Sequence, residues 1–308
     1  KPGGICLTEY DAAAKRIMGY PKRISMGATL RGCLEGPHLY KHAGKYYLIC
    51  AEGGTGYYHC VTVSRADRPD GPYEAYPLNP VLTSVPENHD ESADTDHLKP
   101  HYYNPDAPLQ KAGHGSLCET EDGVPYLAFH CARPFVPELC CTLGRECALT
   151  RMEWTADGWL RQEGGGNLVR EEVPETHLPP FTAKALPVRD DFDEAALLPG
   201  YYAPRIDPKT FADLSSRPGW LRIRGQESLS STNRVSLLVR KLHGLHAEIV
   251  TRMEFAPELY QHSAGLVLCY DSMNYVWLRK TWSEEQNCPV LSVQEVGRGV
   301  KNDHRDLE

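Results

Sequence analysis

A carboxylic acid followed by Gly-Pro is the part of this sequence with the clearest chemical potential. Glu35 begins the run Glu35-Gly-Pro-His-Leu-Tyr, just before a strand-like apolar segment. A carboxyl group at the mouth of a strand, beside apolar and aromatic neighbours, can have a raised pKa and donate a proton to a leaving group. Hydrolysis of a glycoside needs such an acid, and a second group that activates water or attacks the sugar. Glu35 is therefore a candidate general acid. The alternative is a glutamate that caps a turn before a strand.

Three further residues could bind a sugar. Thr55 lies in a turn with three glycines, where the backbone can approach a ligand closely. His114 stands between two glycines, and its ring could hydrogen-bond a ligand or bind a cation. Arg145 could make two hydrogen bonds to sugar oxygens or hold a carboxylate ionised. The alternatives are a flexible hairpin, a structural histidine and a surface arginine paired with Glu146.

Other histidines and acids are better explained by structural roles or by a solvated loop than by a role in the site. His59 and His130 stand at the ends of strand-like runs, and we interpret them as structural. The segment from Val85 to Pro108 is rich in Asp, His, Asn and Pro, and predicts a long surface loop near the mouth of the site. A solvated loop is the favoured reading. A metal site is the alternative, and its ligands would be His89, Asp90, Asp94, Asp96, His97 and His101.

The candidate residues are set between short strand-like runs. Runs such as 45–51, 59–64, 125–130 and 146–154 are separated by turns that contain Gly and Asp, which supply the backbone angles of tight hairpins. No long stretch shows a helical period. Regular strands without helices predict an all-β sandwich, barrel or propeller.

A second β segment follows a linker. Residues 171–189 are rich in Pro and Glu and predict the linker. Beyond it, apolar and polar residues alternate in runs such as 247–255 and 264–270, as they do in half-buried strands. The polar tail from 297 to 308 is expected to fray.

Composition excludes several classes of function. The 308 residues carry a net charge of −8, which argues against a nucleic-acid partner because phosphate binding needs clustered Lys and Arg. No apolar run approaches the ~18 residues of a membrane span. The eleven cysteines are scattered and form no Cys-x-x-Cys pair, so a structural zinc site is not expected. Reduced thiols suggest a cytosolic protein.

The motifs together resemble a known family. Those that contain Glu35, Thr55, His114 and Arg145 occur in the order typical of glycoside hydrolase family 43, the five-bladed β-propeller β-xylosidases and α-L-arabinofuranosidases. The second segment resembles the β-sandwich domain that follows the propeller in these enzymes. The motifs that carry this second resemblance begin at Tyr202, Trp220 and Ala264.

The resemblance implies an architecture and an activity. The fold would be all-β, with a partial five-bladed β-propeller in residues 1–170, a linker, and an incomplete, jelly-roll-like β-sandwich in residues 190–308. The activity would be that of an inverting hydrolase that releases terminal xylose from xylooligosaccharides. Glu35 would be the general acid. Thr55, His114 and Arg145 would bind substrate, and His114 would lie where some relatives hold calcium. No other cofactor is implied.

The sequence departs from the family pattern at the general base. Members of the family place an Asp base on the first blade and a second Asp, which tunes the acid, on a later one. The residues that precede Glu35 supply neither. We therefore expect the base from a companion N-terminal fragment or from sequence outside these 308 residues. The alternatives are an α-L-arabinofuranosidase of the same family and a non-catalytic carbohydrate-binding remnant. By analogy with relatives, a homo-oligomer is possible.

Overall fold

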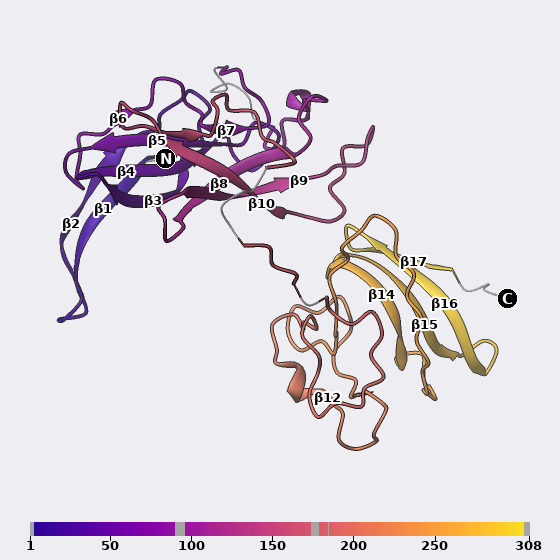
Figure 1. Cartoon of the computed structure of the whole chain (residues 1–308). Coiled ribbons are helices and arrows are strands. Elements are labelled where there is room, and N and C mark those ends of the chain that lie inside the picture. Colours follow the sequence, from indigo (N-terminus) through magenta and orange to yellow (C-terminus); the bar gives the residue numbers. More distant parts are fainter. Residues whose placement is uncertain (1–2, 90–95, 174–178, 184, 305–308) are drawn as a thin grey trace. The chain divides into compact units, whose positions relative to one another are not determined.

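The chain forms two compact β-rich units. The structure is a computed structural model, and it describes residues 3–89, 96–173, 179–183 and 185–304. The two units are Lys1–Pro180 and Phe181–Glu308 (Figure 1). Helix occurs in the described ranges only as two single 3-10 turns, η1 (Pro100–Tyr102) and η2 (Pro208–Thr210). The predicted all-β class is confirmed.

The first unit contains one hairpin and two antiparallel sheets. The strands of the hairpin and of the first sheet are β1 (Ile5–Asp11), β2 (Arg16–Ser25), β3 (Glu35–His42), β4 (Lys45–Glu52), β5 (Cys60–Ala66), β6 (Glu74–Ala75) and β7 (Leu82–Thr83). The strands of the second sheet are β8 (Gln110–Glu119), β9 (Pro125–Ala132), β10 (Glu146–Trp154) and β11 (Leu160–Gln162). The second sheet follows chain order from β8 to β11, whereas in the first sheet both β6 and β7 pair with β5.

Strand β4 explains why the first sheet is buried on both faces. Its sequence is apolar without interruption from Tyr46 to Ala51, and successive side chains in a strand point to opposite faces. Tyr47 and Ile49 pack into a large core shared with the second sheet, while Leu48 and Cys50 pack into a smaller cluster on the other face. A continuous apolar run is therefore the expected pattern for this central strand.

The large core joins the two sheets of the first unit. Leu127, Phe129 and Met152 of the second sheet are buried in the same cluster as the inward side chains of β4 and β5. The Tyr47 hydroxyl donates a hydrogen bond to the Gly158 carbonyl at 2.6 Å across this junction. The two sheets are thus rigidly packed neighbours, and their facing ends can hold side chains in fixed positions.

The register of the first sheet places one row of residues across four strands. Glu35 pairs with Ala51, Ala51 with Val61, and Val61 with Leu82. The same end of this sheet therefore carries the start of β3, the turn between β4 and β5, and the long connection that leaves β7 after Thr83. This end holds the predicted site.

The second unit is built around one four-stranded sheet. Its strands are β14 (Ser263–Asp271), β15 (Asn274–Ser283), β16 (Cys288–Gly297) and β17 (Val300–His304). A short pair, β12 (Ala212–Asp213) and β13 (Arg222–Ile223), precedes it. The tail was expected to fray, but Val300–His304 pairs with β16 as a regular strand.

The strand expected at residues 247–255 is not formed. This stretch has the alternating pattern, but it makes no ladder with any described strand, and Ile249 and Val250 are largely exposed. An alternating pattern stabilises a strand only where a partner supplies hydrogen bonds and one face is buried. Neither condition is met for this stretch.

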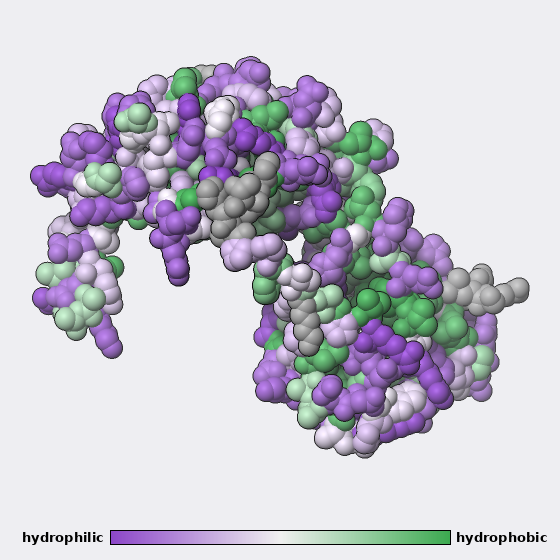
Figure 2. Space-filling model, in the orientation of Figure 1, coloured by the Kyte–Doolittle hydropathy of each residue, from purple (hydrophilic) through white to green (hydrophobic). Residues whose placement is uncertain are grey.

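One face of the four-stranded sheet is apolar and exposed. The register puts Leu268 opposite Val276 and Leu266 opposite Leu278, so these side chains share a face. Leu268 is 57% exposed and Leu278 is 44% exposed. Figure 2 shows hydrophobic residues gathered over this part of the second unit.

The eleven cysteines are all free thiols. Cys50, Cys60 and Cys131 are buried in the first unit, where they pack as small apolar side chains. Within the described ranges, no helix is long and apolar enough to cross a membrane.

Candidate active site

Glu35 is the first residue of β3 and its side chain is exposed. The register of β3 against β4 shifts between Glu35 and His38, which marks a β-bulge. Gly36 forms this bulge with a φ of +57°, a left-handed angle that favours glycine. A bulge re-aims the side chains beside it. The Glu-Gly-Pro sequence therefore sets the direction of the carboxyl group.

The ring of His114 lies directly on the backbone of Gly36. A Cβ atom at Gly36 would stand 2.6 Å from His114 Nε2, so no larger residue fits at this position. His114 lies in β8, in a second irregular stretch where the register shifts between Gly113 and Ser116, and its φ is +55°. Two bulges on neighbouring sheets thus face each other, and they bring the acid and the imidazole together.

His59 lies behind this pair and is fully buried. Its Nδ1 is 3.2 Å from the Lys111 carbonyl oxygen, which can only accept a hydrogen bond, so Nδ1 carries the proton. Nε2 is then a lone pair, and it has no hydrogen-bond partner among the described residues. Burial lowers the pKa of His59 to about 3, with a further contribution from the charge of Arg145. His59 is therefore a neutral imidazole with an unpaired ring nitrogen among the described residues, on the floor of the site.

The three side chains form one cluster. One ligand atom each from Glu35, His59 and His114 lie within 4.8 Å of one another. Within the described part of the chain, this cluster contains two imidazoles and one carboxylate, and no second carboxylate joins it. The arrangement can donate a proton from the carboxyl group, but it does not supply a water-activating carboxylate of its own.

Arg145 lies just before β10 and close enough to the cluster for its charge to act on His59. Its Nη2 donates a hydrogen bond to the Thr55 carbonyl oxygen at 2.8 Å, and its charge lowers the pKa of His59 and of His130. For His130 the larger cause is burial. Thr55 is exposed, and the contact that ties it to the site is made by its backbone.

The structure therefore brings the predicted residues to one place. Glu35 and His114 are in the same cluster, and Arg145 lies close to it and binds Thr55. His59 was interpreted from sequence as structural, yet it belongs to the cluster. His130 is next to it, with its ring centroid 5.7 Å from that of His114. The signal available in the sequence was the position of His59 at the end of the glycine-rich turn, just before β5.

Comparison with known proteins identifies this architecture. The family model described as glycosyl hydrolases family 43 matches residues 1–160. The chain belongs to glycosyl hydrolase family 43. A second model, described as the beta xylosidase C-terminal Concanavalin A-like domain, matches residues 189–306. The predicted fold, part of a propeller followed by a β-sandwich, is confirmed for this family 43 chain. The exact domain boundaries stay a prediction.

Several relatives of this family 43 chain have been named by activity. A beta-xylosidase of Bacillus subtilis is 36% identical over 92% of this chain and 51% of its own length. A non-reducing end alpha-L-arabinofuranosidase of Bacteroides ovatus is 34% identical over 83% of this chain and 45% of its own length. The crystal structure of a xylan beta-1,4-xylosidase from Bacillus halodurans has a TM-score of 0.86 and 42% identity, over 97% of this chain and 54% of that one. The chain spans about half the length of the relatives it matches.

Glu52 is a second carboxylate near the site, but its role is structural, since it fixes the backbone that leads into β3. It is 1% exposed and accepts hydrogen bonds from the backbone nitrogens of Ala28 at 2.7 Å and Thr29 at 3.0 Å. The hydroxyls of Thr29 and Thr62 also donate to it. Because four donors saturate its oxygens, Glu52 fixes the segment that leads into β3 and is not free to act on a substrate.

Arg31 is a second buried charged residue near the mouth. It is 1% exposed, and all five of its N–H groups are used. The acceptors are neutral oxygens of the turn between β4 and β5, of β7 and of the connection after it, namely Tyr58 O, Thr83 Oγ1, Val85 O, Glu87 O and Asn88 Oδ1. The guanidinium group therefore holds the beginning of the 85–108 connection against the turn that carries Thr55.

The alternative of a metal site in this connection receives no support from the described residues. Residues 90–95, which include Asp90 and Asp94, lie outside them. Of the remaining candidates, His89, Asp96, His97 and His101 form no metal-binding group in the part of the chain that the structure describes. Their role as ligands stays a prediction.

Proposed function

We propose that the protein acts as an inverting exo-β-xylosidase that releases terminal xylose from xylooligosaccharides, with Glu35 as the general acid. The observation that supports this most is the cluster of Glu35 and His114 at two facing bulges, with Arg145 beside it. Two relatives at 36% and 42% identity carry the name of a xylosidase.

The proposed chemistry assigns one proton transfer to this chain. The Glu35 carboxyl group donates its proton to the glycosidic oxygen as the bond between that oxygen and the anomeric carbon breaks. A water molecule attacks the anomeric carbon from the opposite face and loses its proton to a base, so the configuration inverts. Arg145 and Thr55 would bind the sugar hydroxyls, and the ring of His114 would line the pocket floor.

The base is proposed to come from outside these 308 residues, on a companion N-terminal fragment or an upstream segment. In inverting glycosidases the two carboxyl groups stand about 6.5–9.5 Å apart, which leaves room for the water. The cluster around Glu35 offers only imidazoles as neighbours within 4.8 Å. Loss of general base catalysis typically lowers the rate by about 10²–10⁴-fold. Such a segment is therefore required for full activity.

Calcium at His114 was the implied metal. Calcium takes six to eight oxygen ligands. The donor set here is two imidazole nitrogens and one carboxylate, so these side chains do not by themselves fit calcium. No step of the proposed reaction runs through a metal.

The test is hydrolysis by the intact protein, meaning this chain together with the segment that supplies the base. We expect it to release xylose from xylobiose and from nitrophenyl xyloside, and to give the inverted anomer first when the reaction is followed by proton NMR. A retained anomer as the first product would contradict the mechanism. Calorimetry that finds binding of xylobiose in a preparation without any turnover would favour a carbohydrate-binding remnant instead.

An α-L-arabinofuranosidase is the second candidate, because the Bacteroides ovatus relative carries that name at 34% identity. The ratio of kcat/KM on nitrophenyl xyloside to kcat/KM on nitrophenyl arabinofuranoside separates the two. A ratio above one supports the xylosidase, and a ratio well below one supports the arabinofuranosidase.

The partner proposal has its own test. The 308-residue chain should gain xylosidase activity when it is mixed with an N-terminal family 43 fragment that carries the first blades. The matched control is the same fragment with its base Asp replaced by Asn. Equal activity with both fragments would contradict an external base.

A further inference from the structure

The cluster of Glu35, His59 and His114 has the composition of a site for a transition-metal ion. Two imidazoles and one carboxylate are a common set of protein ligands for zinc, with a fourth position left open. Calcium takes six to eight oxygen ligands, and this cluster offers a single carboxylate. Imidazole nitrogens suit Zn²⁺ and its neighbours in the periodic table. The donors therefore favour such an ion over calcium.

The three ligand atoms are close enough to share one ion. They lie within 4.8 Å of one another, so one central point is no more than about 2.8 Å from each of them. Bonds from zinc to imidazole nitrogen and to carboxylate oxygen are about 2.0–2.2 Å long, so each atom must move inward by less than about 1 Å. The Glu35 side chain is exposed and has the freedom to make the largest share of this movement.

His59 supplies the clearest sign of a ligand at this place. Its Nδ1 donates a hydrogen bond to the Lys111 carbonyl oxygen at 3.2 Å, which leaves the lone pair on Nε2. Nε2 is buried and has no hydrogen-bond partner among the described residues. A buried polar atom without a partner is costly, and binding to a metal ion removes that cost. Histidines that bind metals typically donate their other N–H to a carboxylate or a backbone carbonyl, as His59 does.

Two glycines hold the imidazoles in position. A Cβ atom at Gly113 would stand 2.4 Å from Cγ of His59, and a Cβ atom at Gly36 would stand 2.6 Å from Nε2 of His114. Each ring therefore lies directly on a backbone segment, where few other orientations fit. The two rings are 77° apart in orientation, with their centroids separated by 6.5 Å. Ligands that are fixed before the ion arrives lose little conformational freedom on binding.

The charges around the cluster set a limit on the affinity. Ionised Glu35 attracts a divalent cation. Arg145 lies close enough for its charge to act on His59, so it repels a cation at the same place. Arg145 is exposed and is tied to the Thr55 carbonyl oxygen at 2.8 Å, so solvent screens part of this repulsion. We therefore expect weaker binding than at a closed structural zinc site.

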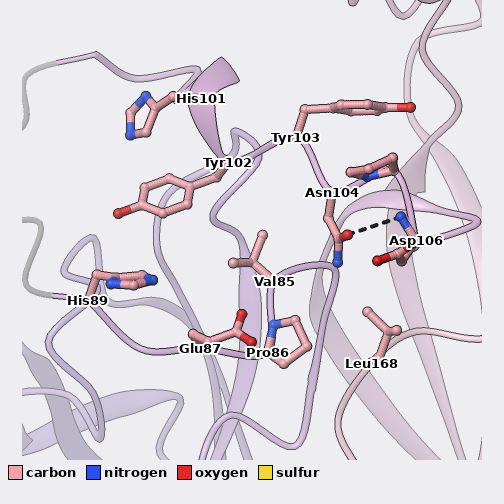
Figure 3. A pocket seen from close by; sticks show the side chains of 11 residues that line it. Val85, Pro86, Glu87, His89, His101, Tyr102, Tyr103, Asn104, Asp106 and Leu168 are labelled. Carbon is pink, nitrogen blue, oxygen red and sulfur yellow. Dashed lines mark hydrogen bonds between the residues drawn. The ribbon is translucent and has the colours of Figure 1, made fainter.

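Another group of histidines and acids in the first unit does not form such a site. Figure 3 shows His89 and His101 on one side of the pocket that follows β7, with Glu87 below and Asp106 on the far side. The ligand atoms of these residues do not meet in a metal-binding group of three. Among the described residues, the Glu35 cluster is the one place where geometry and composition agree.

We propose that Glu35, His59 and His114 together bind a divalent transition-metal ion such as Zn²⁺ in preference to calcium, and that the bound ion inhibits the enzyme. The ion takes the lone pairs of the Glu35 carboxylate, so this group no longer carries the proton that the departing oxygen needs. The binding stands on the geometry of the cluster, whereas the inhibition rests on the proposed function.

The binding test is a titration of the 308-residue chain with Co²⁺, whose visible absorption strengthens when a protein binds it with low coordination number. We expect a spectrum of bound Co²⁺ that Zn²⁺ abolishes and that an equal concentration of Ca²⁺ leaves unchanged. Glu35→Gln and His59→Asn each remove one of three ligands, so each should raise the Kd for Co²⁺ at least roughly tenfold. The matched controls, Glu121→Gln and His246→Asn, replace exposed side chains elsewhere and should leave this Kd unchanged.

The inhibition test follows the release of xylose from xylobiose by the intact protein, first with a chelator and then with added metal. Zn²⁺ at about ten times its Kd fills about nine-tenths of the sites and should lower the rate roughly tenfold. Ca²⁺ at the same concentration should leave the rate unchanged.

The outcomes separate the site from its effect. The site is refuted if no bound Co²⁺ is seen, if Ca²⁺ displaces it as well as Zn²⁺ does, or if Glu35→Gln leaves the Kd unchanged. The Glu35→Gln result decides the matter if His59→Asn does not fold. Binding without inhibition, or a rate that rises with Zn²⁺, would overturn the inhibition. An absence of hydrolysis both with and without metal would instead refute the proposed function, while the titration still decides the site.

Discussion

Replacement of Arg31 by lysine should destabilise the first unit more than any conservative change at its surface. Lysine keeps the positive charge but has three N–H donors in place of five. At least two of the five hydrogen bonds that Arg31 now donates would then be lost. Water cannot readily replace them, because the side chain is 1% exposed.

The magnitude follows from the number of hydrogen bonds lost. A hydrogen bond to a charged group contributes about 1.5–3 kcal/mol. Two such bonds give a loss of about 3–6 kcal/mol in the free energy of unfolding. The loss should be concentrated where the acceptors lie, in the turn at Tyr58 and in residues 83–88.

Urea denaturation of the intact protein measures the global loss, and hydrogen exchange of the backbone amides from 83 to 89 measures the local one. The matched control is Arg68→Lys, at a side chain that is 75% exposed and paired with Asp70 on the surface, where a change near zero is expected. A loss below about 1 kcal/mol for Arg31→Lys, with unchanged exchange, would refute the view that this arginine anchors the connection.

Three further predictions concern the cluster and the thiols. Gly36→Ala should lower kcat at least tenfold and should also lower the thermal midpoint, because the left-handed backbone and the ring of His114 leave no room for a methyl group. An unchanged kcat would contradict this. The pKa of His59 is lowered to about 3, so between pH 6.5 and 3 the unfolded chain binds a proton that the folded chain does not. The free energy of unfolding should therefore fall by about 1.4 kcal/mol for each pH unit of acidification in this window, and it should fall less steeply in His59→Asn. Parallel pH profiles for the two proteins would count against this prediction. Burial raises the pKa of the Cys60 thiol to about 12. Iodoacetamide at pH 8 should therefore label the exposed Cys33 in the native protein and leave Cys60 unmodified, which peptide mass spectrometry can show. Equal labelling of the two thiols would be inconsistent with the fold.

Much of the first unit could be predicted from the sequence because its strands carry local signals. The strand predicted at 146–154 matches β10 at both ends, and the turns between strands contain the glycine and aspartate residues that tight hairpins need. The apolar run before Glu52 is long enough for one strand and too short for a buried helix. Local pattern and tertiary packing agree in this unit.

The second unit was less predictable because its local patterns depend on partners. Residues 247–255 alternate like a strand but pair with no described strand, whereas the polar tail forms β17 because β16 lies beside it with free backbone groups. Composition alone underestimates such a strand, since edge strands are often polar. Whether these segments form strands depends on their pairing with other strands, and a single sequence does not reveal that pairing.

The sequence predicted most residues of the candidate site, but it did not predict His59, which lies on the floor of the site. Glu35 and His114 stood out because each is flanked by glycine, and the structure shows why, since close contact at Gly36 and Gly113 excludes a side chain. His59 gave no such signal. Its role depends on burial and on a hydrogen bond to Lys111, which lies 52 residues away in the chain. Long-range contacts of this kind cannot be derived from local spacing.

The most direct test of the account is the response of Glu35→Gln to the quality of the leaving group. A general acid is needed when the departing oxygen is a poor leaving group and is nearly dispensable when it is a good one. In the intact protein we predict that the variant loses about 10²–10⁴-fold of kcat/KM on xylobiose and much less on dinitrophenyl xyloside. Equal losses on both substrates, or wild-type cleavage of xylobiose, would contradict the assignment of Glu35 as the proton donor.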